Sequence, residues 1–268
     1  MKIVIASYGK SGSTALFYKI KDSLSGEIKT FFEVSSLKGI NLNKCDHVIV
    51  KTFYTYPDWD KSSFEQFDKR ISLVRDPRDY IVSFFLYMAG FHSNYASDDS
   101  KVNDMLRLLR RKEEKNDSVS FLDLLKLHGS LSGNNYLEKM KNQWNRIMQC
   151  LPLVDTYFTF KYEYFVLGNM DSLSEYLGFN LSGEARVEDE YKRVVRTKSL
   201  GDWKNWFLPE DIEFFYPLFN AFIEKYGYSK SWNLPPLQQV LPRNSSFYFE
   251  RLIAERRNIK DDPSIFTF

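Results

Sequence analysis

A stretch of eight residues near the N-terminus combines side chains that can hold an anion. The sequence SYGKSGST, residues 7–14, directly follows the apolar run IVIA. Glycines allow the backbone to turn tightly and to approach a ligand closely. Backbone N–H groups at a helix start favour phosphate, while Lys10 adds a point charge and Ser13 and Thr14 add hydroxyl donors. The stretch therefore predicts a site for a phosphate or a similar anion.

The spacing of this loop argues against a nucleoside triphosphate site. The pattern G-x-x-x-x-G-K-[ST] would place its first glycine at Val4, which lies inside the expected first strand. The loop is thus too short for a typical ATPase or GTPase. A glycine-serine turn that binds nothing is the alternative interpretation.

Two further stretches carry cationic side chains that could bind an anion. In ISLVRDPRDYIVSFF, residues 71–85, Arg75 ends an expected strand and Ser83 lies two turns into an expected helix. A forked guanidinium and a hydroxyl could both reach one phosphate group, although a surface Arg-Asp pair is the simpler reading. The second stretch, VVRTKSLGDWKNWF, gathers three cations around a Gly201 turn: Arg196, Lys198 and Lys204.

Alternating strand and helix patterns must position these residues. Short apolar runs predict strands at residues 2–6, 47–51, 70–75 and 155–161. Helical patterns follow at residues 14–24, 77–89 and 162–177. This alternation predicts an α/β fold: a single domain with a central parallel sheet flanked by helices, and a P-loop-like loop after the first strand.

We expect one domain over residues 1–232. The polar segment 93–135 is interpreted as an insertion or lid, with a mobile loop at its start and helices near 103–111 and 121–128. Residues 233–268 are expected to form a C-terminal tail that packs back on the domain through Phe247-Tyr248-Phe249.

Composition narrows the function classes. The 268 residues carry a net charge of +2, which is low for a nucleic-acid-binding domain. The two cysteines and three histidines are scattered and show neither metal-ligand spacing nor a disulfide framework. We expect no metal, no nucleic acid, no transmembrane segment and a cytoplasmic location. The basic run at residues 107–112 is interpreted as a solvated helix face.

Taken in order, the three cationic stretches resemble the sulfotransferases that use 3′-phosphoadenosine 5′-phosphosulfate (PAPS). SYGKSGSTAL resembles that family's YPKSGTTWL loop, RDPRDYIVSFF resembles R-x-P-x-D-x-x-x-S, and RTKSLGDWKNWF resembles R-K-G-x-x-G-D-W-K-N. The likeness spans residues 1–232, which the resemblance makes a sulfotransferase domain. It implies transfer of a sulfuryl group from PAPS to a hydroxyl or amine, with adenosine 3′,5′-bisphosphate (PAP) as the product.

The resemblance also implies roles for individual residues. The 5′-phosphosulfate would be held by Lys10, Ser11, Gly12, Ser13 and Thr14. The 3′-phosphate would be bound by Arg75 and Ser83 and covered by Arg196, Thr197 and Lys198. Tyr162 would contact adenine. Lys10 would neutralise the leaving phosphate and Lys51 would reach the sulfonate oxygens, so that no metal is required.

Four positions depart from the family pattern. Phe53 stands where many members carry a histidine base, and Ala15 stands where a tryptophan follows the first loop. Thr197-Lys198 replaces a Lys-Gly pair, and Tyr164 replaces the aspartate of a Y-E-D segment.

The absence of the usual base leaves several candidates. His92 follows the Ser83 helix, and histidine titrates in a range that suits proton transfer; an ordinary loop histidine is the alternative interpretation. Asp58 and Asp60 could act, or be turn residues, and His128 is expected at a surface or capping position. An acidic acceptor such as a phenol would need no strong base.

Two other functions remain open. A protein that binds PAPS or PAP without catalysis would explain Phe53, and a P-loop nucleotide kinase would share the strand-loop-helix unit. The acceptor is expected to be a small molecule or a glycan, and the resemblance makes a homodimer possible.

Overall fold

The computed structural model describes residues 1–42 and 45–258. Its contacts divide the chain into two compact units. The sheet unit comprises residues 1–75 and 145–192, and the helical unit comprises residues 76–144 together with the described chain from Arg193 onwards. Each unit is described by itself, and the domain boundaries expected from sequence stay a prediction.

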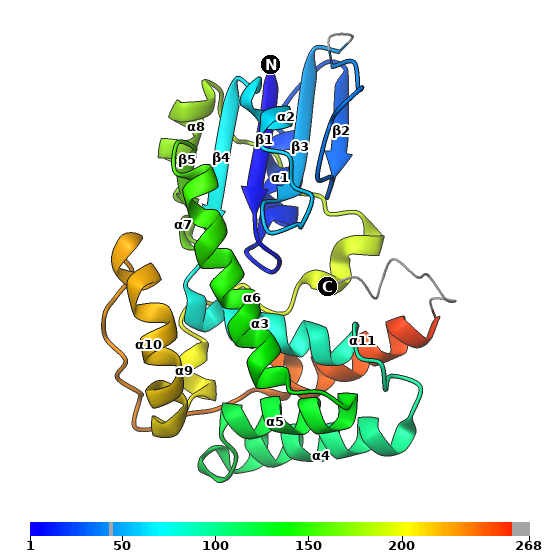
Figure 1. The fold of residues 1–268 in the computed structure, drawn as a ribbon, viewed down its shortest axis with the longest axis vertical. Coiled ribbons are helices and arrows are strands. Elements are labelled where there is room, and N and C mark those ends of the chain that lie inside the picture. Colours follow the sequence, from blue (N-terminus) through cyan, green and yellow to red (C-terminus); the bar gives the residue numbers. More distant parts are fainter. Residues whose placement is uncertain (43–44, 259–268) are drawn as a thin grey trace. The chain divides into compact units, whose positions relative to one another are not determined.

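The sheet unit contains a five-stranded, all-parallel sheet in the order β2-β3-β1-β4-β5. The strands are β1 (Lys2–Ser7), β2 (Ile28–Phe32), β3 (His47–Phe53), β4 (Lys69–Val74) and β5 (Phe158–Lys161). Figure 1 shows β1 between β3 and β4. Ile5 is the partner of Lys51 on one side and of Ile71 on the other. The predicted α/β fold with a central parallel sheet flanked by helices is confirmed.

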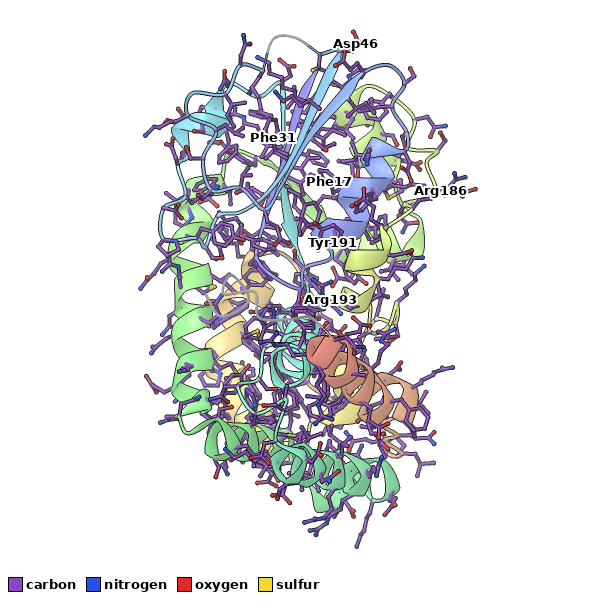
Figure 2. The ribbon with its side chains drawn as sticks, turned by 90° about the vertical axis from the view of Figure 1, so that its right-hand side faces the viewer. Phe17, Phe31, Asp46, Arg186, Tyr191 and Arg193 are labelled. Carbon is purple, nitrogen blue, oxygen red and sulfur yellow. The ribbon has the colours of Figure 1, made fainter. Side chains whose placement is uncertain are left out.

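Helices cover this sheet because its central strands are apolar on both faces. They are α1 (Ser13–Lys21), α2 (Ser62–Glu65), α7 (Tyr162–Leu167) and α8 (Asp171–Leu177), with a 3-10 turn η2 (Leu151–Val154). Phe17 of α1 and Tyr191 of the turn η3 (Asp189–Val194) both pack on Phe32, with ring centroids 5.3 and 4.4 Å away. Figure 2 labels Phe17 and Tyr191. These three aromatic rings therefore pack together beside the edge strand β2.

Three expectations for the sheet unit were wrong. The edge strand β2 was missed, because IKTFF is only partly buried and lacks the uninterrupted apolar pattern of a central strand. The strand expected at residues 155–161 begins only at Phe158, after the turn η2. The helix expected over 162–177 is broken at Gly168, whose φ of 76° is left-handed and ends α7.

The helical unit is built on α3 (Pro77–Gly90). Asp76 caps this helix by accepting a hydrogen bond from the Arg78 backbone, and Pro77 provides a fixed φ at the first position. The other helices are α4 (Asp99–Glu114), η1 (Asn116–Ser118), α5 (Phe121–Ser132), α9 (Trp203–Trp206), α10 (Pro209–Lys225), η4 (Pro242–Asn244) and α11 (Ser246–Asn258), while α6 (Tyr136–Cys150) passes from this unit into the sheet unit.

Two residues of the polar segment 93–135 are buried, which differs from the interpretation of that segment as a mobile loop and a solvated helix face. Lys112, expected on a solvated face, is fully buried and donates from Nζ to the Val119 carbonyl oxygen at 2.6 Å. Tyr95, in the loop before α4, is also buried. Within the described residues, no helix has the length and apolar character needed to cross a bilayer.

Candidate functional site

The loop between β1 and α1 has the backbone of an anion cradle. Lys10 adopts a left-handed conformation with φ of 61°, and Gly12 follows with φ of 95° before α1 begins at Ser13. Alternating backbone conformations of this kind turn successive N–H groups to one side. The Ser11 hydroxyl is buried and has no hydrogen-bond partner among the described residues. A buried unpaired hydroxyl is costly unless a ligand satisfies it.

Arg75 is locked to this loop by its backbone and by its side chain. The Tyr8 hydroxyl donates to the Arg75 carbonyl oxygen and accepts from the Arg75 N–H, each at 3.0 Å. The guanidinium donates to the Lys10 carbonyl oxygen at 2.9 Å. The Arg75 Nε is buried and finds no partner in the described part of the chain. One edge of the guanidinium is therefore used to hold the loop, and Nε remains a donor for a ligand.

Tyr162, the first residue of α7, joins the same cluster. Its ring lies so close to Gly12 that a Cβ there would be 2.2 Å from the Tyr162 Cδ2. The Arg75 guanidinium also lies over the Tyr162 ring, with its central carbon 4.6 Å from the ring centroid. The resemblance assigns Gly12, Arg75 and Tyr162 to one nucleotide site. The fold brings these three residues into contact within the sheet unit.

Lys51 lies at the same end of the sheet, on β3. It is 1% exposed, donates to the Thr14 Oγ1 at 3.1 Å and forms a short ion pair with Glu33. Its ammonium also faces the rings of Phe32 and Phe53, with centroids 4.0 and 4.7 Å away. Burial lowers the pKa of Lys51, and Glu33 opposes that shift. The lysine is thus a buried charge held against the anion loop.

Glu33 is the residue that sequence reasoning missed. It follows β2 directly, in a left-handed conformation with φ of 57°, and its side chain is 36% exposed. Non-glycine residues in this conformation are strained and concentrate at functional sites. Its only sequence signal was its place after β2, a strand that was itself missed.

In the helical unit, Arg196 presents unused donors. Its Nη1 donates to Asp202 at 2.7 Å and to the Asn244 carbonyl oxygen at 3.3 Å. Its Nε and Nη2 are buried without a partner in the described residues. The partly buried Thr197 bonds Ser199 through its hydroxyl, and Lys198 is exposed.

Ser83 and the Arg196 segment belong to elements that are tied together. Ser83 is buried on α3. Four residues before it, Asp79 accepts hydrogen bonds from the N–H groups of Gly201 and Trp203 at 2.6 and 2.9 Å. The helix that carries Ser83 therefore anchors the turn that follows Arg196.

The candidate bases lie in different units of the chain: Asp58 and Asp60 in the sheet unit, and His92 in the helical unit. His92 packs against Tyr87 and Phe91 in the helical unit. Asp58 accepts from Ser35, and Asp60 accepts from serine hydroxyls, as turn residues do.

The expectation of a surface or capping role for His128 was wrong. Its ring is buried and its Nδ1 is 2.9 Å from the Tyr95 hydroxyl. Burial lowers the pKa of His128 to about 3, with a smaller effect of Lys139. Within the described residues, no group of three or more histidine, cysteine or acidic side chains could hold a metal ion.

Comparison with known proteins supports the same fold. No family model matches the chain, and no curated protein matches it. Among solved structures, the chain is similar to a crystal structure of the mouse sulfotransferase SULT7A1 complexed with PAP, with a TM-score of 0.52 and 17% identity. The match covers 83% of this chain and 84% of that chain. At this identity the likeness concerns architecture, and the protein has the fold of a sulfotransferase.

Proposed function

We propose that this protein is a sulfotransferase that moves the sulfuryl group of PAPS to a hydroxyl or amine of a small-molecule or glycan acceptor. The proposal rests on two buried donors that have no partner within residues 1–42 and 45–258, Ser11 Oγ and Arg75 Nε. They accompany a loop whose backbone conformation suits an anion. Fold similarity to a PAP-bound sulfotransferase supports it. PAPS would supply an activated sulfuryl group whose leaving group is a phosphate.

The residues of the sheet unit fit the donor. Residues 10–14 would hold the 5′-phosphosulfate, with Lys10 as the counter-charge, and Tyr162 would contact adenine. Arg75 would bind the 3′-phosphate through the side of its guanidinium that Lys10 does not use. Lys51 would stabilise sulfonate oxygens, since it already contacts the Thr14 hydroxyl.

In the helical unit, the resemblance assigns contacts with the 3′-phosphate to Ser83 and Arg196. Ser83 would donate its hydroxyl, and Arg196 would supply the two nitrogens that have no partner among the described residues. Thr197 and Lys198 would close over the nucleotide.

Glu33 is the candidate general base that takes the place of the missing histidine. Its carboxylate contacts Lys51, and its side chain is exposed enough for an acceptor to reach. The neighbouring Phe53 cannot accept a proton, and His92, whose ring packs against Tyr87 and Phe91, stays an alternative candidate base. When Lys51 binds the sulfonate oxygens instead of Glu33, the Glu33 carboxylate could take the proton of the acceptor.

The first experiment is calorimetric titration with PAP in the absence of magnesium. Arg75→Ala removes charge-assisted hydrogen bonds, each worth about 1.5–3 kcal/mol, so we expect PAP affinity to fall at least tenfold. Arg186→Ala is the matched control, because this arginine is 77% exposed and pairs with Glu184 on the surface. Unchanged binding in Arg75→Ala, or tighter binding of Mg-ATP than of PAP, would contradict the proposal and favour a kinase.

A second candidate is a PAP-binding protein without catalysis, which Phe53 favours. Incubation with ³⁵S-labelled PAPS and a panel of phenols, alcohols, amines and glycans separates the two. Glu33→Gln should keep PAP affinity and lose transfer, whereas Glu27→Gln should keep both. PAP binding by the wild type with no labelled product from any acceptor would favour the non-catalytic function.

A further inference from the structure

The C-terminal helix α11 is an integral part of the helical unit. It packs along α3, where Leu252 lies against Gly90. A Cβ at Gly90 would be 2.7 Å from the Leu252 Cβ, so the absence of a side chain at Gly90 is what permits the contact. Tyr248 and Phe249 of α11 are buried, with 2% and 0% exposure. The helix is therefore fixed by apolar packing before any polar contact is considered.

Polar groups of this region reach the backbone on both sides of Arg196. The Tyr248 hydroxyl donates to the Arg193 carbonyl oxygen at 3.3 Å, and Arg251 donates to the Val195 carbonyl oxygen at 2.9 Å. The Asn244 carbonyl oxygen, just before α11, accepts from Arg196 itself. These three residues, Asn244, Tyr248 and Arg251, are named the C-terminal brace.

The other end of the same segment is held by α3. Asp79 fixes the backbone N–H groups of Gly201 and Trp203. The segment from Arg193 to Trp203 is thus attached at both ends, by the brace and by Asp79. Between the attachments, one edge of the Arg196 guanidinium is paired with Asp202, and two of its nitrogens have no partner in the part of the chain that the structure describes.

We infer that α11 is a positioning element that holds Arg196 in the conformation that binds an anionic group of the nucleotide. The inference rests on the proposed function for the identity of the nucleotide. If the segment before Arg196 were released, only a fraction of molecules would present the guanidinium correctly, and the apparent affinity would fall by that fraction. Tyr248 and Arg251 would thus act through Arg196 without touching the ligand.

The test compares a double variant with a matched control on the same helix. Tyr248→Phe/Arg251→Ala removes both hydrogen bonds to the Arg193–Val195 backbone and leaves the apolar face of α11 intact. Arg257→Ala is the control, because Arg257 binds the Ala96 carbonyl oxygen and Asp99 at the start of α4. Amide hydrogen exchange of residues 193–203 without ligand, and calorimetric titration with PAP, are the two readouts.

We expect faster exchange across residues 193–203 and an about three- to tenfold loss of PAP affinity in the double variant, which is the effect of one to two hydrogen bonds. Arg257→Ala should change neither. Exchange rates in the double variant equal to those in the control would overturn the inference, as would faster exchange with unchanged PAP affinity. If the wild type itself fails to bind PAP, the proposed function fails, while the exchange comparison still decides whether α11 holds the segment.

Discussion

The contact between Gly12 and Tyr162 allows a stability change to be worked out from the structure. Gly12→Ala would place a Cβ 2.2 Å from the Tyr162 Cδ2 and 2.5 Å from its Cε2, so the ring must move. Overpacking of this kind costs about 1–3 kcal/mol. The φ of 95° adds strain of about 1–2 kcal/mol for a residue with a Cβ. We expect the free energy of unfolding to fall by about 2–5 kcal/mol.

Displacement of the Tyr162 ring would also remove its stacking with the Arg75 guanidinium, now 4.6 Å from the ring centroid. Gly12→Ala should therefore lower both stability and PAP affinity. Urea unfolding measures the first and calorimetry the second. Gly9→Ala in the same loop is the control, since a Cβ at Gly9 would meet nothing within 4 Å.

A double-mutant cycle separates the clash from the backbone strain. In a Tyr162→Ala background the ring is absent, and Gly12→Ala should cost only about 1–2 kcal/mol, the strain of its φ. An equal cost of Gly12→Ala in both backgrounds would refute the role assigned to the ring. A cost equal to that of Gly9→Ala would refute the reasoning altogether.

Three further predictions follow from single buried contacts. Tyr8→Phe removes the hydroxyl that pairs with the Arg75 backbone N–H and carbonyl oxygen, so the free energy of unfolding in urea should fall by about 1–3 kcal/mol. Tyr157→Phe is the control: it removes a buried hydroxyl without a partner in the described residues, and the free energy of unfolding should fall much less. Because burial lowers the pKa of His128 from 6.5 to about 3, the unfolded state binds more protons than the folded state between these pH values. The free energy of unfolding should therefore fall as the pH drops, by on the order of 5 kcal/mol. The His128→Phe/Tyr95→Phe variant should show a flatter pH profile in thermal unfolding, and an identical profile would contradict the assignment. Asp79→Ala frees the N–H groups of Gly201 and Trp203 and should speed their amide exchange and lower the melting temperature, whereas exchange at wild-type rates would show that another group holds the turn.

The sequence predicts the central sheet well, because buried strands leave a local apolar pattern, whereas the anion-binding role of the first loop stays a prediction. The strands β1, β3 and β4 are continuous apolar runs, and the glycine-serine loop follows β1 directly. The edge strand β2 carries no such pattern, since its residues are only partly buried. Local pattern thus identifies buried elements and misses the marginal ones.

The contacts within the site depend on residues far apart in the chain. Gly12 must be a glycine because the Tyr162 ring occupies the space of a Cβ. Nothing in the sequence around either residue predicts this contact. The pairing of Lys51 with Glu33 and the burial of Lys112 and His128 likewise arise from packing between elements. Charged residues are normally exposed, so a composition-based reading places them at the surface.

The central position of β1 has a consequence for how the protein is made. The strand β1 precedes both of its sheet partners in the sequence: it pairs with β3 on one side and β4 on the other, at residues 47–53 and 69–74. The sheet unit is completed only when residues 145–192 arrive, after the whole 76–144 segment of the other unit has been synthesised. Such long-range parallel pairing slows folding. During translation β1 is therefore synthesised before its partners, and a nascent chain ending near residue 68, which lacks β4, should be a substrate for chaperones that bind exposed hydrophobic segments.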